Sequence, residues 1–260
     1  MDAVSEWIYR ALLGLVGVCV GSLLNVIIYR VPLILQGNAP RRVSLWFPGS
    51  FCPRCEKALM PGDNIPLVSW IILRGRCRWC REPISRQYPA TEAMTLLLTL
   101  LTASLLPAGP LLVAAVLLGW WLLALALIDG MHFLLPDCLT LSLLWLGLLC
   151  HLGGIVPSVT LAQGVAGAAT GYSVFRGLAW IYKSLSGEEG LGRGDAKLLA
   201  AGGVWLGWQA LPAVLLLASL GGLMTFTVAR LWLRRPLSAP VPFGPALSIA
   251  IWLLFIWQNR

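Results

Sequence analysis

The sequence has little charge for its length. Charged residues make up 12% of the chain, with 11 acidic residues and 2 histidines, whereas hydrophobic residues make up 58% and include 13 tryptophans. A water-soluble protein does not have this composition, because about a quarter of its residues are normally charged. Several apolar runs approach the roughly 20 residues that a helix needs to cross a bilayer. The composition therefore predicts an all-α polytopic membrane protein.

Several motifs that would define a functional class are also absent from the sequence. It contains no Walker loop, no convincing dinucleotide fingerprint and no Ser/His/Asp arrangement. The net charge of +8 would suit a nucleic-acid partner, but the basic residues cluster in the connections between apolar runs. That clustering is the positive-inside pattern of a membrane protein, and it assigns these connections to the cytoplasmic side. We therefore expect contact with membrane lipid and no nucleic-acid partner.

The apolar runs predict about eight transmembrane helices. The first covers roughly residues 7–28 and is interpreted as a retained helix, because it lacks a clear signal-peptide cleavage site. The stretch 30–90 is rich in Pro, Gly, Cys and basic residues, which indicates a small folded cytoplasmic insert between helices 1 and 2. The predicted parts are thus a first helix (1–29), the insert (30–90) and a seven-helix membrane core (91–260). Within the core the apolar runs lie at about 93–106, 111–128, 139–156, 161–182, 198–211, 213–229 and 244–257.

Asp129 and Asp195 are the candidate catalytic residues. Asp129 ends the third apolar run, and Asp195 precedes the sixth, within Gly192-Arg193-Gly194-Asp195. The alternation of helices places both acids at one membrane surface, where a carboxylate is costly unless it is paired or used. Two facing carboxylates share a proton, so one can activate a water while the other donates to a peptide carbonyl. The pattern therefore favours aspartic protease chemistry.

The residues alone leave other roles open for the same acids. They could cap helices or pair with basic neighbours, or they could bind protons or cations in a transporter. Gly192 and Gly194 have no side chains and would let another backbone approach. Together with Lys197 they form the candidate supporting loop of the site. A third alternative is a noncatalytic assembly factor that holds a partner through the insert.

Four cysteines in the insert predict a metal site. Cys52-Pro53-Arg54-Cys55 and Cys77-Arg78-Trp79-Cys80 are two CxxC pairs, which are typical of a closed, structural zinc site. A disulfide pair is the alternative, but a cytoplasmic loop is reducing. The metal would supply folding energy to an insert too small to bury much core. The remaining cysteines are interpreted as small hydrophobic residues in or beside apolar runs: Cys19, Cys138 and Cys150.

Two smaller patterns predict packing. His151 lies within an apolar run, where a hydrogen-bonded packing role is expected. Small residues recur on one face of the run 161–182 and predict close helix packing there: Gly164, Gly167, Ala168 and Gly171.

Taken together, these residues resemble the bacterial type IV prepilin peptidases, which are aspartic proteases of the GxGD class. The resemblance covers nearly the whole chain. It implies that Asp129 and Asp195 occupy the two catalytic positions, and that Asp137 belongs to the surrounding motif only. The segments that carry it are Gly21–Arg30, the four cysteines, Asp63–Pro66, Gly75–Cys77, Ile128–Asp129, Leu134–Asp137 and Gly192–Lys197.

The resemblance also implies a substrate, a place and a second activity. Members of the family cut a short basic leader from prepilins or type II secretion pseudopilins, after a glycine, at the cytoplasmic face of the bacterial inner membrane. Many then methylate the new N-terminal amine with S-adenosylmethionine, and the zinc-bearing insert is typical of those with both activities. This chain differs from the family pattern at Arg193, where Tyr or Met is common, and at Gln87, where Arg is common. No motif identifies a binding site for the cofactor, and nothing predicts the oligomeric state.

Overall fold

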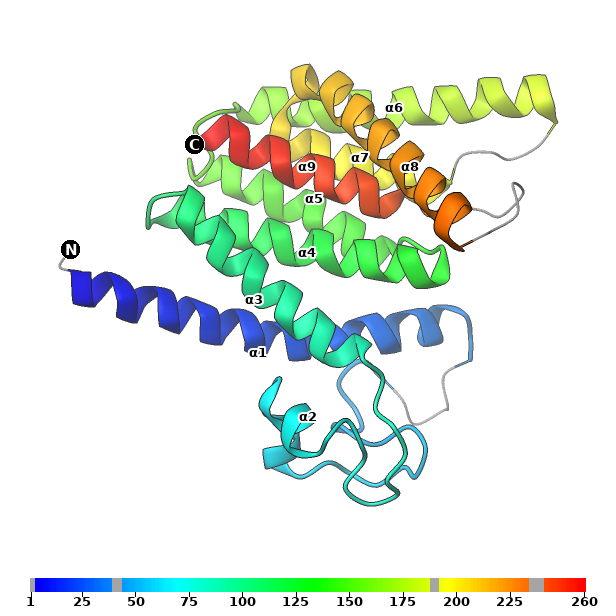
Figure 1. Ribbon diagram of the computed structural model, residues 1–260. Coiled ribbons are helices and arrows are strands. Elements are labelled where there is room, and N and C mark those ends of the chain that lie inside the picture. The colour runs from blue at the N-terminus through cyan, green and yellow to red at the C-terminus, as the bar shows by residue number, and fades with distance from the viewer. Residues whose placement is uncertain (1–2, 39–43, 188–191, 234–240) are drawn as a thin grey trace. The chain divides into compact units, whose positions relative to one another are not determined.

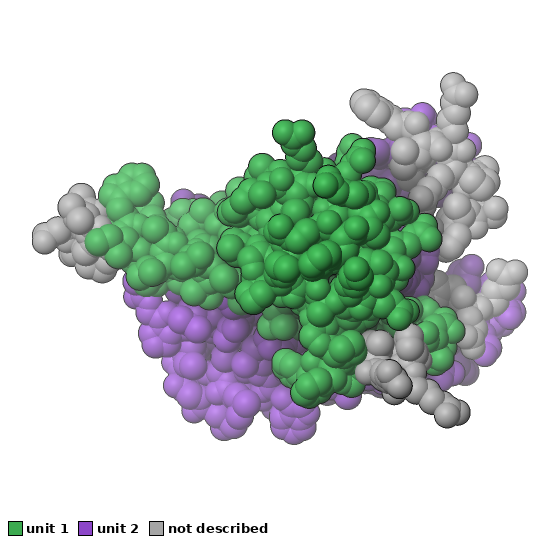
Figure 2. Space-filling model, turned by 90° about the horizontal axis from the view of Figure 1, so that it is seen from below, with its two compact units in different colours: residues 1–104 green, residues 105–260 purple. Residues whose placement is uncertain are grey.

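The computed structural model describes residues 3–38, 44–187, 192–233 and 241–260. Parts of three predicted cytoplasmic loops lie outside these residues, namely 39–43, 188–191 and 234–240. The chain divides into two compact units, residues 1–104 and residues 105–260, which Figure 2 shows in green and purple.

The first unit consists of two long helices and an insert with little regular structure. Helix α1 spans Ala3–Leu35 and helix α3 spans Gln87–Leu105. Between them lie the short 3-10 helix η1 (Pro61–Asn64) and the short helix α2 (Val68–Ile72) (Figure 1). Helix α1 continues through Pro32, beyond the end predicted near residue 28, so the insert begins after Leu35.

Small and hydroxyl-bearing residues let α1 and α3 approach closely. A Cβ atom placed on Gly21 would lie 2.7 Å from the Cα atom of Glu92, and one on Gly17 would lie 2.7 Å from Oγ1 of Thr99. On α3, the hydroxyls of Thr95 and Thr99 donate to backbone carbonyls one turn earlier, at 2.6 and 2.7 Å. The polar groups of this face are therefore satisfied within their own helix, as an apolar environment requires.

The second unit is a bundle of helices (Figure 1). Each apolar run predicted after residue 106 overlaps one of these helices, so the prediction of an all-helical protein is confirmed. Two runs were predicted too long, because α5 ends at Leu152 within the run 139–156 and α7 ends at Leu206 within the run 198–211. The described residues contain no β-strand, only two isolated bridges in the insert. The helices are α4 (Pro110–His132), α5 (Asp137–Leu152), α6 (Leu161–Ser186), α7 (Arg193–Leu206), α8 (Leu211–Leu233) and α9 (Gly244–Asn259), with the short η2 (Trp208–Ala210) before α8.

Helix α7 forms the core of this bundle. Its residues Leu198, Leu199 and Trp205 are fully buried. Helix α6 packs against it through the predicted small-residue face, because a Cβ atom on Gly167 would overlap the backbone of Gly203 and one on Gly171 would lie 2.9 Å from the carbonyl oxygen of Leu199. The prediction of close helix packing is therefore confirmed.

Polar side chains of the bundle bond to backbone carbonyls of neighbouring helices. His151 on α5 lies 2.8 Å from the carbonyl oxygen of Val204, through Nε2. The indole N–H of Trp205 donates to the carbonyl of Leu143 at 3.1 Å. The hydrogen-bonded packing role predicted for His151 is confirmed, and these bonds fix α5 against α7.

Three helical stretches in the described part of the chain are long and apolar enough to cross a membrane by length and composition: Glu6–Leu35, Pro110–His132 and Trp208–Val228. Helices α5 and α9 are apolar but shorter. The structure thus supports a membrane protein with several apolar helices, whereas the number of eight spans stays a prediction.

Candidate active site and metal centre

Asp129 lies in the last turn of α4 and is 6% exposed. The helix ends three residues later, at His132, because Phe133 adopts a left-handed conformation and its N–H bonds to the Asp129 carbonyl at 2.9 Å. The Asp129 side chain accepts a hydrogen bond through Oδ2 from the N–H of Gly244, the first residue of α9, at 2.9 Å. The carboxylate therefore faces the N-terminal end of a second helix, where the exposed N–H groups favour negative charge.

Glycine at position 244 is what makes this contact possible. A Cβ atom there would lie 2.6 Å from Oδ2 of Asp129 and 2.9 Å from its Cγ. Any side chain at this position would displace the carboxylate or the start of α9. Gly244 was not predicted as part of the site, although a glycine directly before Pro245 at the start of an apolar run is a sequence signal for a special helix start.

Asp195 lies in the first turn of α7 and is half-buried. Its carboxylate accepts a hydrogen bond from the backbone N–H of Gly192, the residue that precedes the helix. This is one half of a capping box, in which the third helical residue reaches back to the N-cap amide. A Cβ atom on Gly192 would lie 2.7 Å from Oδ2 of Asp195, so a glycine is needed here as well.

Helix α7 begins earlier than the apolar run that predicted it. The run begins at Leu198, but the helix begins at Arg193. Asp195 and Lys197 are therefore helical residues, and the predicted supporting loop is the first turn and a half of α7.

The structure brings the two predicted catalytic acids together within the second unit. The negative charge of Asp129 acts on Asp195, so the two carboxylates are close enough to interact electrostatically. Each also accepts a backbone N–H at the start of a helix, α9 for Asp129 and α7 for Asp195. A negative charge near a second carboxyl group disfavours ionisation of both acids at once, so one of the two holds its proton more readily. That state offers a base and an acid to the same water and carbonyl group.

Gly194 and Lys197 position the start of α7 against neighbouring segments. A Cβ atom on Gly194 would lie 2.7 Å from the Cβ of Leu135, so the connection between α4 and α5 lies directly against this turn. Lys197 donates from Nζ to Oδ1 of Asp137 at 2.6 Å, which links α7 to the start of α5. Lys197 is thus paired with Asp137. It supports the acid pair indirectly, because this ion pair holds α7 against the start of α5.

The four predicted metal ligands form one cluster in the first unit. The sulfur atoms of Cys52, Cys55, Cys77 and Cys80 all lie within 4.8 Å of one another, and all four cysteines are free thiols. Both CxxC pairs adopt the same turn. In the first, the Cys52 N–H bonds to the Lys57 carbonyl at 3.0 Å and the Glu56 N–H bonds to the Cys52 carbonyl at 2.8 Å. The second turn repeats these bonds at Cys77, Arg81 and Glu82, at 2.9 and 3.0 Å.

The cluster fits a tetrahedral zinc ion. Four sulfurs each about 2.3 Å from a zinc ion would lie roughly 3.8 Å from one another, and the sulfurs of Cys52 and Cys80 are 3.9 Å apart. The Cys80 N–H donates to the Cys77 sulfur and lowers the pKa of that thiol to about 7, which favours the thiolate that a metal needs. At Cys80, desolvation and the neighbouring thiols outweigh a hydrogen bond from the Glu82 amide and raise the pKa to about 11. The first thiolate of the cluster therefore forms readily, and the next thiolates form against its negative charge.

An ion pair that the sequence analysis did not predict supports the second cysteine turn. Arg78 donates from Nε and Nη2 to the Asp63 carboxylate, at 3.0 and 2.6 Å to Oδ1. Asp63 is buried, and these hydrogen bonds from Arg78 lower the pKa of its carboxyl group despite the burial. The sequence does contain a signal for this ion pair, namely an acid within Asp63-Asn64-Ile65-Pro66 and an arginine within the second CxxC pair.

Comparison with known protein families defines the class to which these two regions belong. The family described as the bacterial peptidase A24 N-terminal domain matches residues 15–106. The type IV leader peptidase family matches residues 116–227. The division between the two matches falls near the boundary between the two compact units, so the cysteine cluster and the acid pair lie in separate parts of a leader peptidase.

Curated relatives extend this similarity over nearly the whole chain. A protein of Aeromonas salmonicida (strain A449) is 46% identical over 97% of this chain and 92% of its own length. A protein of Pectobacterium carotovorum subsp. carotovorum is 44% identical over 94% and 91%, and one of Pseudomonas aeruginosa is 41% identical over 95% and 89%. All three are named prepilin leader peptidase/N-methyltransferase. No solved structure gives a significant match.

The chain therefore belongs to the prepilin leader peptidase/N-methyltransferase family. This membership makes it an enzyme of that class, a peptidase that is also an N-methyltransferase. The transporter alternative finds no support among these relatives, and the several apolar helices agree with a protein of the inner membrane.

Proposed function

We propose that this enzyme removes the basic leader of a prepilin or pseudopilin by cutting after a glycine at the cytoplasmic face of the membrane, and then methylates the new N-terminal amine. The observation that carries the peptidase part is the approach of Asp129 and Asp195. They come from different helices of the second unit, yet they interact electrostatically and each is bonded to an amide at the start of a helix.

The cleavage step uses the two acids in complementary protonation states. The ionised carboxylate takes a proton from a water, and the water oxygen forms a bond to the carbonyl carbon of the scissile peptide. The protonated carboxyl group donates to the carbonyl oxygen, and the carbon–nitrogen bond then breaks as the leaving amine takes up a proton. The Gly244 N–H, which is bonded to Oδ2 of Asp129, holds that carboxylate in place during these transfers.

The substrate must be unwound at the bond that is cut, because a helical peptide hides its carbonyl carbons from attack. A glycine before the scissile bond lowers the helical preference of the substrate there. The absence of side chains at Gly192 and Gly194 keeps the start of α7 narrow. We infer that specificity rests on the substrate glycine and its hydrophobic helix more than on the charge of the leader.

The methyltransferase part belongs with the first unit in this proposal. Cys52, Cys55, Cys77 and Cys80 would hold a structural zinc ion that stabilises the insert. S-adenosylmethionine, when bound, would supply the methyl group that the deprotonated amine receives. The protein would need to bind the donor and to present the new amine in its neutral form.

The experiment that tests the peptidase part is mass spectrometry of a prepilin incubated with membranes that contain this enzyme. Cleavage after glycine by the wild type is expected, with a further methyl mass on the new N-terminus. Asp129→Asn and Asp195→Asn should each reduce cleavage by at least about 100-fold, because each removes one partner of the proton transfer. Asp137→Asn is the matched control and should still cleave, because this acid pairs with Lys197 instead. Wild-type turnover by both single variants would overturn the assignment.

A further inference from the structure

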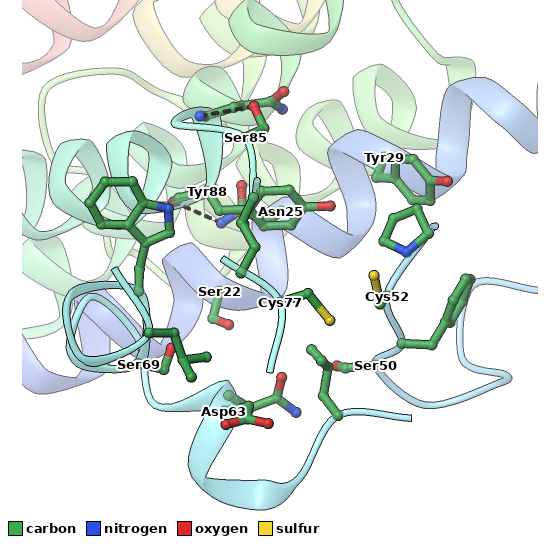
Figure 3. Close-up of a pocket in the computed structure, with 18 of the residues that line it drawn as sticks. Ser22, Asn25, Tyr29, Ser50, Cys52, Asp63, Ser69, Cys77, Ser85 and Tyr88 are labelled. Atoms are coloured by element: carbon green, nitrogen blue, oxygen red, sulfur yellow. Dashed lines mark hydrogen bonds between the residues drawn. The ribbon is translucent and has the colours of Figure 1, made fainter. Parts of the chain in front are cut away.

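The short helix α2 presents an apolar face to the outside of the first unit. Val68, Ile71 and Ile72 are 48%, 68% and 71% exposed, and residues three and four positions apart lie on the same side of a helix. The other side of α2 lines a cavity of about 460 Å³ within this unit, where Figure 3 labels Ser69. The outward face of α2 is thus made of branched aliphatic side chains. Adjoining exposed side chains of this kind mark a surface that meets a partner or a membrane.

Two contacts place α2 at the depth of the membrane-spanning part of α1. The N–H of Leu67, the residue before α2, donates to Oε2 of Glu92 on α3 at 2.7 Å. The backbone of Glu92 lies directly against α1, because a Cβ atom on Gly21 would come within 2.7 Å of the Glu92 Cα atom.

Gly21 lies well inside the stretch of α1 that is long and apolar enough to cross a membrane. At 1.5 Å per residue, it is roughly 10 Å before the predicted end of the apolar run near residue 28. In Figure 1, α2 lies beside the middle of α1 and not beyond its C-terminal end. The exposed face of α2 is therefore at a level where α1 itself meets lipid.

The backbone of this segment suits a membrane environment. The N–H groups of Ser69, Ile71 and Leu73 bond to carbonyls four residues earlier, at 2.9 to 3.1 Å, and the Gly75 N–H bonds to the Trp70 carbonyl at 2.8 Å. A segment that meets lipid must satisfy its backbone groups internally, because lipid tails offer no hydrogen-bond partner. Helix α2 and the turn after it meet this requirement.

The charges around α2 favour a membrane surface with anionic lipid. Residues 64–73 contain no charged side chain, and Arg74 and Arg76 follow them. Both arginines are exposed, and neither pairs with an acid among the described residues. In interfacial helices an apolar side enters the lipid while basic side chains meet anionic headgroups. The same two charges would repel a basic leader, so they favour lipid over a prepilin as the occupant of this face.

We propose that α2 enters the lipid at the membrane surface through Val68, Ile71 and Ile72, with Arg74 and Arg76 at the headgroups. The insert is then not wholly outside the membrane, because this segment anchors it beside α1 and α3. The inference goes beyond the proposed function and does not depend on which reactions the enzyme catalyses.

Photo-cross-linking of the full-length enzyme in vesicles tests the proposal. Photoreactive benzoylphenylalanine replaces Ile72, and the vesicles contain phosphatidylglycerol and phosphatidylethanolamine. Mass spectrometry identifies the molecule that is attached after irradiation. We expect a phospholipid adduct at position 72, both with and without an added prepilin.

Position 58 is the matched control in the same insert. Ala58 is exposed and pairs with Phe51 beside the first cysteine turn. This turn is held beyond the apolar run of α1, because the nearby Gly49 carbonyl accepts a hydrogen bond from Arg30 at 3.1 Å. Benzoylphenylalanine in place of Ala58 should therefore give severalfold less lipid adduct than at position 72.

Two double variants test the anchor without a cross-linker. Ile71→Ser with Ile72→Ser makes the face polar, whereas Ile71→Leu with Ile72→Leu keeps it apolar. In vesicles, trypsin should cut after Arg74 and Arg76 severalfold faster in the Ser variant than in the wild type, and the Leu variant should match the wild type. An unchanged zinc content shows that the insert of the Ser variant is still folded.

Three results would overturn the inference. They are a prepilin or a second copy of the enzyme attached at position 72 in place of lipid, equal lipid adducts at positions 58 and 72, and equal trypsin rates in the Ser and Leu variants. The cross-link is made in a chain that keeps an apolar side chain at position 72, so it decides the matter even if the Ser variant loses its zinc.

Discussion

The two units of this enzyme fix their functional groups over very different distances along the chain. In the first unit, each cysteine turn closes through hydrogen bonds between residues four and five positions apart, such as Glu56 to Cys52. In the second unit, Asp129 is held by an amide 115 positions further along the chain, at Gly244. The cysteine turns thus form locally, and a metal bound by the four thiols would join them, whereas the acid pair forms only when the helices have packed.

This difference explains why the two sites respond differently to damage. The insert has little buried core, so we expect its stability to depend on the four cysteines that would hold a zinc ion. The two carboxylates of the acid pair are each held by a backbone amide at the start of a helix. A small change in one of these contacts should therefore lower the cleavage rate more than it lowers the stability of the fold.

Removal of the metal should unfold the insert. Cys52→Ser combined with Cys77→Ser removes one ligand from each turn, and the lost metal binding corresponds to roughly 10 kcal/mol of folding free energy in small zinc domains. We expect the zinc content, measured by mass spectrometry of the metal, to fall from about one ion per chain to none, and proteolysis within residues 36–86 to become rapid.

Cys138→Ser is the control for that experiment, because Cys138 is exposed and lies outside the cluster. Its zinc content and protease resistance should equal those of the wild type. Full zinc content in the double Cys→Ser variant would show that the four thiols do not form the metal site.

A single methyl group at the start of α9 should impair cleavage. Gly244→Ala places a Cβ atom 2.6 Å from Oδ2 of Asp129, so the hydrogen bond that holds this carboxylate must lengthen or break. Loss of a hydrogen bond to a charged group costs about 1.5–3 kcal/mol. We therefore expect the rate of prepilin cleavage to fall about 10- to 100-fold, with little change in the melting temperature.

Gly222→Ala is the matched control for the start of α9. Its added Cβ atom would lie 3.6 Å from Phe243, which is an ordinary contact, and cleavage should stay close to the wild-type rate. Equal rates in both glycine variants would show that the contact between Gly244 and Asp129 is not needed for cleavage.

The smallest effect is expected at the ion pair between Lys197 and Asp137. The Asp137 side chain is 61% exposed, and ion pairs of this kind contribute about 1 kcal/mol or less. Lys197→Met and Asp137→Asn should each reduce the cleavage rate by less than about fivefold, and the double variant should be no worse than either. If Lys197→Met alone abolished cleavage, Lys197 would act on the acid pair directly.

Much of this architecture follows from sequence patterns, and the exceptions have physical causes. The apolar runs predicted the helices, but α7 begins at Arg193, before its apolar run, because the Gly192 amide and the Asp195 carboxylate cap it. Helix α1 likewise continues past its apolar run, through Pro32. Hydropathy identifies the apolar part of a helix. It does not identify the residues by which a helix extends beyond that part.

The site residues divide in the same way. The cysteines were predictable because their spacing is local, and the acids because a carboxylate beside an apolar run is unusual. Gly244 was missed because its role depends on an acid far away in the chain. Contacts between distant segments leave no periodic signal in a single sequence.

The measurement that tests the account most directly separates the two activities on one pair of substrates. An intact prepilin and a peptide that already begins at the mature N-terminus are each incubated with the enzyme and S-adenosylmethionine, and mass spectrometry records cleavage and methylation. We expect Asp129→Asn to fail to cleave the prepilin yet to methylate the mature peptide at the wild-type rate. Loss of both activities together in folded Asp129→Asn would contradict this expectation.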